Sequence, residues 1–189
     1  MLFASLFGYR LVHYWGYSSK PLWFFETLVF AALALAYVFR IPAQVPAQGW
    51  LEHILPYVCS AIPFAMLFSP WNPGPWKGTS LTLMISGLTI TMAGIGSLGR
   101  SFGITVAVRH MVQHGLYRWI RHPIYLGEIV NTFGVATLRF SPLSAAILLA
   151  FITLQTLRAR LEERKLLAVC PEEYAAYMKR TGMFVPRLL

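Results

Sequence analysis

The sequence predicts an all-α, polytopic membrane protein of about five transmembrane helices, ending in a helical hairpin and a cytoplasmic tail helix. Of its 189 residues 57% are apolar and only 12% are charged, and the mean hydropathy is +0.56. These values are typical of a chain that folds in a bilayer. Apolar runs near the length of a spanning helix recur along the sequence. The last two runs are separated only by residues 139–142, so their helices must form an antiparallel pair.

Proline, glycine and basic residues mark the ends of the apolar runs. A spanning helix needs about 20 mostly apolar residues, and five runs approach this length: 22–39, 50–68, 80–98, 123–138 and 143–157. The last helix is expected to continue to about Val169. A short tail helix from Pro171 to Arg180 should follow and end at Gly182. Residues 1–20 fit either an interfacial amphipathic helix or a short extra span, and we expect them to be retained rather than cleaved.

The basic residues favour one side of the membrane. With five spans, 12 of the 16 Lys and Arg residues fall on one side, and the other four are Arg10, Lys20, Lys77 and Arg139. The richer side should be cytoplasmic, which places residues 99–122 and 158–189 together there. We therefore divide the single membrane domain into spanning helices, 1–98, and a connector, hairpin and tail, 99–189. Any chemistry is expected in the second part.

The acidic residues exclude several kinds of mechanism. All seven are glutamates and the chain has no aspartate, which excludes aspartic dyads, Asp-bound magnesium clusters, EF-hands and kinase-type catalytic loops. Cys59 and Cys170 offer neither a metal-ligand cluster nor a disulfide framework, so no metal is expected. The net charge of +9 lies at the ends of apolar runs, which favours contact with membrane lipids over nucleic acid.

A glycine motif in the third run, Gly94-x-Gly96-x-x-Gly99, matches the dinucleotide-binding fingerprint by letters only. It ends an apolar helix, no strand precedes it, and no acidic residue follows about 20 positions later. Close packing of small residues between membrane helices explains it better. The candidates for that packing are Gly87, Ala93, Gly94 and Ser97.

Charged, imidazole and phenol side chains crowd residues 115–128, at the entrance of the fourth run. Such a density is costly to bury without a purpose. Pro123 suits the first turn of a helix because its missing N–H would be unpaired there. Arg121 and His122 then lie at the positive end of the helix dipole, which favours a bound carboxylate. The alternative is an ordinary belt of Arg and aromatic residues at the membrane interface.

A second polar group lies where the fifth run ends. Arg158 and Glu162 are four residues apart and share one helical face, although a solvated helix end with ion pairs is the alternative. If the hairpin turns at its midpoint, Glu162 lies level with Trp119. Arg158 then lies level with Pro123. The two polar groups would line one pocket, suited to a charged cofactor facing a lipid-soluble substrate.

Three motifs occur together in the second half of the chain. They are G-x-Y-x-x-x-R-H-P-x-Y-x-G from Gly115 to Gly127, R-x-x-x-E from Arg158 to Glu162, and E-E-Y-x-x-Y from Glu172 to Tyr177. Together they resemble the isoprenylcysteine carboxyl methyltransferase family over about residues 94–189. The resemblance implies an integral membrane enzyme that uses S-adenosylmethionine (SAM). In eukaryotes, members of this family methylate the carboxylate of a prenylated C-terminal cysteine.

The resemblance also implies residue roles. Arg158 would face the methyl acceptor, and Arg121 would steady either the SAM carboxylate or the acceptor. The partners would be SAM, a lipophilic acceptor and membrane lipids, while the oligomeric state stays open. Contacts to SAM are implied for Arg109, His110, Met111, Val112, Tyr117, His122, Pro123, Ile124, Tyr125 and Glu162.

The chemical class of the acceptor stays open. A carboxylate is already ionised at neutral pH and needs only an Arg to orient it. An amine must lose a proton, which calls for Glu128, Glu163 or His122 as the base, and a thiol could form a thiolate in basic surroundings. Methylation of a phospholipid amine or a small thiol on the same fold is therefore a second hypothesis. A non-enzymatic membrane transport or assembly protein is the third.

Overall fold

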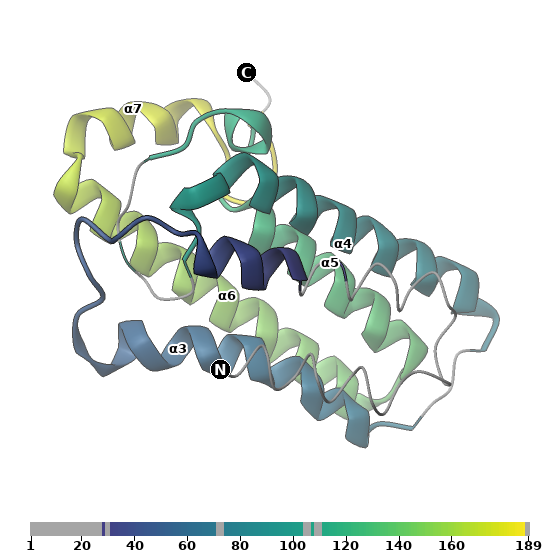
Figure 1. Ribbon diagram of the computed structural model, residues 1–189. Helices are drawn as coiled ribbons and strands as arrows, with labels where there is room; N and C mark the ends of the chain where they lie inside the picture. Colours follow the sequence, from purple (N-terminus) through teal and green to yellow (C-terminus); the bar gives the residue numbers. More distant parts are fainter. Residues whose placement is uncertain (1–27, 29–30, 71–73, 104–106, 108–110, 188–189) are drawn as a thin grey trace.

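The described part of the chain is a bundle of helices (Figure 1). The structure is a computed structural model that describes residues 28, 31–70, 74–103, 107 and 111–187. Within these residues every regular element is helical, which confirms the all-α prediction. In chain order they are α3 (Gly49–Ala61), η1 (Ile62–Phe68), η2 (Gly74–Trp76), α4 (Lys77–Leu98), η3 (Gly99–Ser101), η4 (Gly115–Arg118), α5 (Pro123–Leu138), α6 (Pro142–Val169) and α7 (Pro171–Arg180).

Prolines set where the last three helices begin. Pro123, Pro142 and Pro171 each occupy the first position of a helix, where a missing N–H costs no hydrogen bond. Ser141 adds a capping box before α6: its Oγ accepts from the Ser144 backbone N–H at 3.1 Å, and Ser144 Oγ accepts from the Ser141 N–H at 3.0 Å. The predicted end of the long helix at Val169 and the tail helix from Pro171 are both confirmed.

Three helical stretches are long and apolar enough to cross a membrane, judged by length and composition: Gly49–Phe68, Lys77–Ser101 and Pro142–Val169. They match the second, third and fifth predicted runs. The fourth run forms α5, which has 16 residues and is therefore only about 24 Å long. Most of the first run and all of residues 1–20 lie outside the described residues, although residues 31–38 are helical. The count of about five spans stays a prediction.

Helices α4 and α5 pack closely against each other through small residues. A β-carbon on Gly87 would lie 2.4 Å from the backbone nitrogen of Asn131, and one on Gly127 would lie 2.7 Å from the backbone nitrogen of Thr91. Such distances leave room for glycine alone. The predicted packing role is therefore confirmed for Gly87, and for Gly94, whose β-carbon would meet Ile124 at 2.8 Å. It is wrong for Ala93, which is exposed on the other side of α4.

Buried contacts hold α5 and α6 together at both ends of their hairpin. At one end Ala136 and Ile147 pack with Met66 of η1, and Arg139 in the turn donates to the Ser69 carbonyl at 2.6 Å. At the other end Ile124 and Ala159 share a core with Ile95 of α4. This core therefore contains residues from both predicted parts of the chain.

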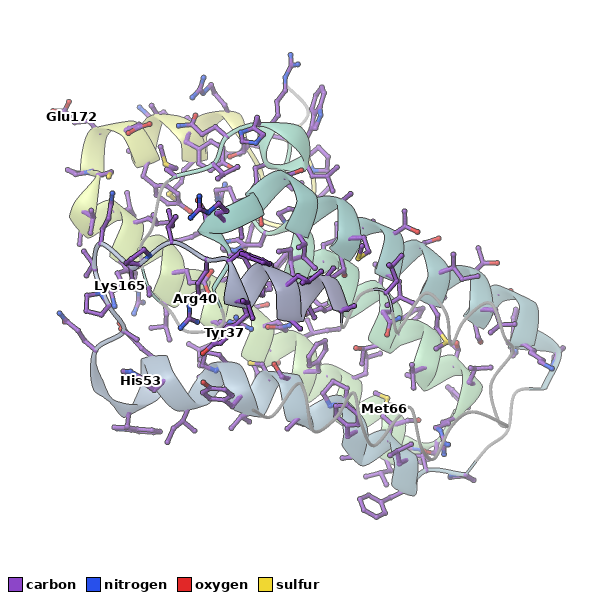
Figure 2. The ribbon with its side chains drawn as sticks, in the orientation of Figure 1. Tyr37, Arg40, His53, Met66, Lys165 and Glu172 are labelled. Atoms are coloured by element: carbon purple, nitrogen blue, oxygen red, sulfur yellow. The ribbon has the colours of Figure 1, made fainter. Side chains whose placement is uncertain are left out.

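Helix α3 lies along α6 and is fastened to it by charge (Figure 1). Lys165 near the end of α6 forms an ion pair with Glu52 and donates to the Pro46 carbonyl at 2.8 Å. Figure 2 shows Lys165 and His53 near the end of the bundle where α6 meets α7, and Met66 far from it. The charged residues of α3 and α6 therefore lie at the end of the bundle that carries α7.

Replacing Gly87 with alanine should separate α4 from α5, because its β-carbon would meet the backbone of Asn131. We expect the free energy of unfolding to fall by about 1–3 kcal/mol, the usual cost of overpacking. Gly96→Ala is the matched control, since nothing lies within 4 Å of a β-carbon there. Thermal unfolding in detergent micelles measures both variants, and equal Tm values would contradict the packing of α4 on α5.

Candidate functional site

The entrance of α5 is held in place by the C-terminal tail. The backbone N–H groups of Arg121 and His122 donate to the carbonyls of Gly182 and Met183, at 2.9 and 3.1 Å. The tail turns sharply at Gly182, where a β-carbon would lie 1.7 Å from the Val185 carbonyl oxygen. A glycine is therefore required at this position. The tail fixes the backbone from which the His122 side chain projects.

Arg121 ties three parts of the chain together. Its Nε donates to Glu163 Oε1 on α6 at 2.6 Å, and one terminal nitrogen donates to the Thr181 carbonyl in the tail. The Arg121 and Glu163 side chains are both more than nine-tenths buried. The structure thus gives Arg121 a positioning role at the joint of α5, α6 and the tail. Its predicted contact with the SAM carboxylate or the acceptor stays a prediction.

His122 lies between the two neighbouring glutamates of α6. Glu163 Oε1 accepts from His122 Nε2 at 3.2 Å, and Glu162 Oε2 lies 3.9 Å from Nδ1. The imidazole stacks on the Tyr125 ring with centroids 5.3 Å apart and planes 8° from parallel. Because the ring is held on its edge and its face, its orientation is fixed.

Tyr125, Arg158 and Glu162 form the second half of the cluster. The Tyr125 hydroxyl donates to Glu162 Oε1 at 2.5 Å. The Arg158 guanidinium lies 4.6 Å from the centre of the Tyr125 ring, and its Nε is 3.6 Å from Glu162 Oε1. Arg158 is 5% exposed, whereas the Glu162 side chain is 24% exposed. Glu162 is therefore the member of this group most accessible to a ligand.

The predicted meeting of the two polar groups is confirmed. Three residues at the entrance of α5, Arg121, His122 and Tyr125, contact two neighbouring glutamates on α6 that lie about 40 positions away in the sequence. The contact follows from the short turn at residues 139–141, which fixes the relative height of α5 and α6. The site therefore contains an imidazole, two guanidiniums, a phenol and two carboxylates within a few ångströms.

Three phenols are buried where the tail helix meets η4: Tyr174 and Tyr177 of α7, and Tyr117 of η4. Tyr177 donates its hydroxyl hydrogen to the Tyr117 carbonyl at 2.6 Å. Burial raises the pKa of Tyr177 to about 12 and raises the pKa values of Tyr117 and Tyr174 further. These three phenols are therefore neutral at physiological pH, and they act as hydrogen-bonding and packing groups rather than as bases.

The remaining predicted SAM contacts are partly described. Pro123 and Ile124 are buried in the first turn of α5, and Met111 and Val112 are half-buried in the connector before η4. Arg109 and His110 lie outside the described residues. The connector is linked to α7, because Gln113 donates to Glu173 at 3.0 Å and accepts from Arg180 at 3.2 Å.

Sequence reasoning gave too little weight to Glu163 and did not single out Thr181 or Met183. Glu163 was considered only as a candidate base, but it is the residue that holds both Arg121 and His122. In the sequence, only Gly182 after α7 indicated that the tail turns back toward the bundle. No group of three or more His, Cys or acidic side chains able to hold a metal ion occurs among the residues that the structure describes.

The described residues suit a nucleoside that carries a positive charge. Glu162 can accept from a ribose hydroxyl or an ammonium group, and it is the partly exposed carboxylate of the cluster. The stacked His122 and Tyr125 rings provide a flat, fixed wall beside it. Ile95 and Phe102 pack with Tyr125 in one apolar core. This donor set fits the charged group and the sugar of SAM.

Comparisons with known proteins agree with this arrangement. Residues 80–168 match the isoprenylcysteine carboxyl methyltransferase (ICMT) family. The chain is 33% identical to a nickel-cobalt-cadmium resistance protein of Alcaligenes xylosoxydans xylosoxydans, over 78% of this chain and 72% of that protein. It is 28% identical to protein-S-isoprenylcysteine O-methyltransferase B of Arabidopsis thaliana, over 74% of this chain and 73% of that protein.

The name of a third relative indicates that this relative acts on a small thiol. The chain is 28% identical to methanethiol S-methyltransferase 1 of Bradyrhizobium diazoefficiens, over 67% of this chain and 52% of that protein. The chain spans about half the length of several of the curated relatives it matches.

The fold also matches a solved structure. A eukaryotic intramembrane Ras methyltransferase, isoprenylcysteine carboxyl methyltransferase, superposes with a TM-score of 0.59 at 22% identity, over 98% of this chain and 75% of that one. At this identity the likeness concerns the fold. With the matched motifs and the relatives above, it leads to one conclusion: the chain belongs to the isoprenylcysteine carboxyl methyltransferase family.

Proposed function

We propose that this protein is a methyltransferase that moves a methyl group from SAM to a lipophilic acceptor at the membrane boundary. One observation carries the proposal: a charged, largely buried cluster of His122, Tyr125, Arg158 and Glu162 lies where apolar helices end. Ionisable groups at this depth are costly and usually functional. The family relationship supplies the reaction class. The basic residues predicted on this side support a cytoplasmic site.

We propose that SAM binds beside the partly exposed Glu162 carboxylate. Bound SAM supplies an electrophilic methyl group on a positively charged sulfur. Glu162 would accept from its ribose hydroxyls or its ammonium group, with Tyr125 orienting the carboxylate. The other proposed contacts are Arg109, His110, Met111, Val112, Tyr117, His122, Pro123 and Ile124.

Arg158 is proposed to orient the acceptor. It lies on the membrane side of Glu162 in the sequence of α6, and its guanidinium is fixed on the Tyr125 ring. An isoprenylcysteine-like carboxylate, suggested by relatives of that name, would need no base. During methyl transfer the negative charge of this carboxylate and the positive charge of the sulfonium would cancel. The low dielectric at the membrane boundary would assist such a reaction.

A thiol is the second proposed acceptor. A relative named methanethiol S-methyltransferase supports it, and a carboxylate on the membrane side of the site, Glu128, is placed to receive a proton. A phospholipid amine would have the same requirement for a base. A non-enzymatic transport or assembly role is the competing proposal, and binding of SAM separates it from all the methyltransferase proposals.

Neutralising Glu162 should weaken SAM binding. A lost charge-assisted hydrogen bond costs about 1.5–3 kcal/mol, so we expect Glu162→Gln to raise the Kd about 10-fold to 100-fold, measured by isothermal titration in detergent. Glu172→Gln is the matched control, because Glu172 is an exposed glutamate of α7 (Figure 2). Equal affinity for both variants would contradict the assigned site. No saturable binding to the unchanged chain would support the non-enzymatic role.

Replacing Arg158 with lysine should impair transfer more than SAM binding. Lysine keeps the charge but loses the planar fork that stacks on Tyr125, so we expect kcat/KM for the acceptor to fall at least about tenfold. Transfer of radiolabelled methyl groups to a farnesylated cysteine analogue, an alkyl thiol and a phospholipid amine measures it. Arg160→Lys, at an exposed position of α6, should behave like the unchanged chain. An unaltered kcat/KM in Arg158→Lys would exclude Arg158 as the orienting group.

A further inference from the structure

A second polar pair lies deeper in the bundle than the proposed SAM site. Glu128 is five residues beyond Pro123 along α5, about 7 Å farther from the helix entrance. The side-chain amide of Gln155, on α6, donates to Glu128 Oε2. Gln155 is 1% exposed, whereas Glu128 is half-buried. A carboxylate and an amide at this depth are unusual, because ionisable groups in a membrane helix are expensive.

The Glu128–Gln155 pair offers a ligand hydrogen-bond acceptors. Gln155 uses its N–H on Glu128, and its buried Oε1 has no hydrogen-bond partner among the described residues. Leaving such an oxygen without a donor costs about 1–3 kcal/mol. A carboxylate ligand has no hydrogen to give to Gln155 Oε1 or to Glu128. A ligand that carries an S–H, N–H or O–H hydrogen can donate it to one of these two acceptors.

The charges around the pair also disfavour an anionic ligand. Arg158 interacts electrostatically with both Glu128 and Glu162, so one guanidinium faces two carboxylates. The excess negative charge suits the positive sulfur of SAM, and it repels a second anion. A neutral acceptor adds no charge to this balance, whereas an ammonium group adds a second cation beside the sulfonium.

Glu128 is the carboxylate of the site best able to take a proton. Glu163 accepts from Arg121 and His122, and Glu162 accepts from Tyr125 and pairs with Arg158. In the described part of the chain, Glu128 accepts one side-chain hydrogen bond, from the neutral Gln155 amide. The charge of Arg158 also acts on Glu128, but Arg158 Nε makes a close ion-pair contact, 3.6 Å, with Glu162 Oε1. A carboxylate held closely by a cation loses more on protonation.

We propose that Glu128 and Gln155 form the acceptor subsite for a neutral alkyl thiol, with Glu128 as the catalytic base. This rests on the proposed function. The S–H proton moves to a carboxylate oxygen of Glu128 while the thiol sulfur bonds to the methyl carbon. The bond from that carbon to the sulfonium sulfur breaks, and its electron pair stays on the departing sulfur. One negative and one positive charge cancel, which a site of low dielectric favours.

Three probes that share one alkyl chain test the proposal: hexanethiol, hexanoate and hexylamine, each with radiolabelled SAM and the full chain in lipid nanodiscs. We expect methylation of hexanethiol to have the highest kcat/KM. Glu128→Gln should lower that kcat/KM at least about 100-fold, the usual contribution of a general base, and Glu128→Asp should recover part of it. SAM affinity should fall much less in Glu128→Gln than in Glu162→Gln, because Glu128 lies beyond the proposed SAM contacts. Glu172→Gln is the matched surface control.

Binding adds a readout that does not depend on turnover. Gln155→Leu removes the Oε1 acceptor with little change in size, so it should weaken hexanethiol binding without SAM at least about fivefold, measured by competition with a fluorescent alkyl probe. An unchanged thiol kcat/KM in Glu128→Gln, or a preference for hexanoate or hexylamine, overturns this inference and leaves the methyltransferase proposal standing. Failure of the unchanged chain to bind SAM would overturn both.

Discussion

The hydrogen bonds from Arg121 and His122 to Glu163 are the interaction on which the site depends. They join the entrance of α5 to α6 inside a region that is more than nine-tenths buried. A buried ion pair adds little net stability, because desolvation offsets most of the attraction. The ion pair instead specifies one arrangement of α6 relative to α5. Sliding or rotating α6 would leave Glu163 charged and unpaired, at a cost of several kcal/mol. One carboxylate thus fixes where its neighbour Glu162 points.

The sequence was most informative where local chemistry decides the structure. Prolines at positions 123, 142 and 171 and the short hairpin turn fixed helix starts and relative heights, so the meeting of Tyr125 with Glu162 was predictable. What it could not fix was the rotation of helices against one another. Small residues occur on several faces of α4, and only packing shows that Gly87 meets α5 while Ala93 is exposed.

The same limit explains Glu163 and the tail. Glu162 and Glu163 differ by one position and hence by about 100° around α6, so which glutamate faces His122 depends on tertiary contacts. The tail contributes backbone carbonyls from Thr181 and Met183, and main-chain acceptors leave no trace in residue type. The juxtaposed motifs were therefore predictable, while the groups that support them were not.

The exposure of the side chains falls along α6 from Glu162 to Gln155. Glu162 is partly exposed, Arg158 is nearly covered, and Gln155 is completely buried along the same helix. In the proposed reaction, a water-soluble methyl donor would approach the exposed end of this series and the alkyl chain of the acceptor would approach the buried end. Arg158 lies between them with its charge already opposed by Glu162. A nucleophile that arrives neutral and loses its proton on site therefore meets less electrostatic resistance than one that arrives as an anion, because no second negative charge must be desolvated beside two carboxylates.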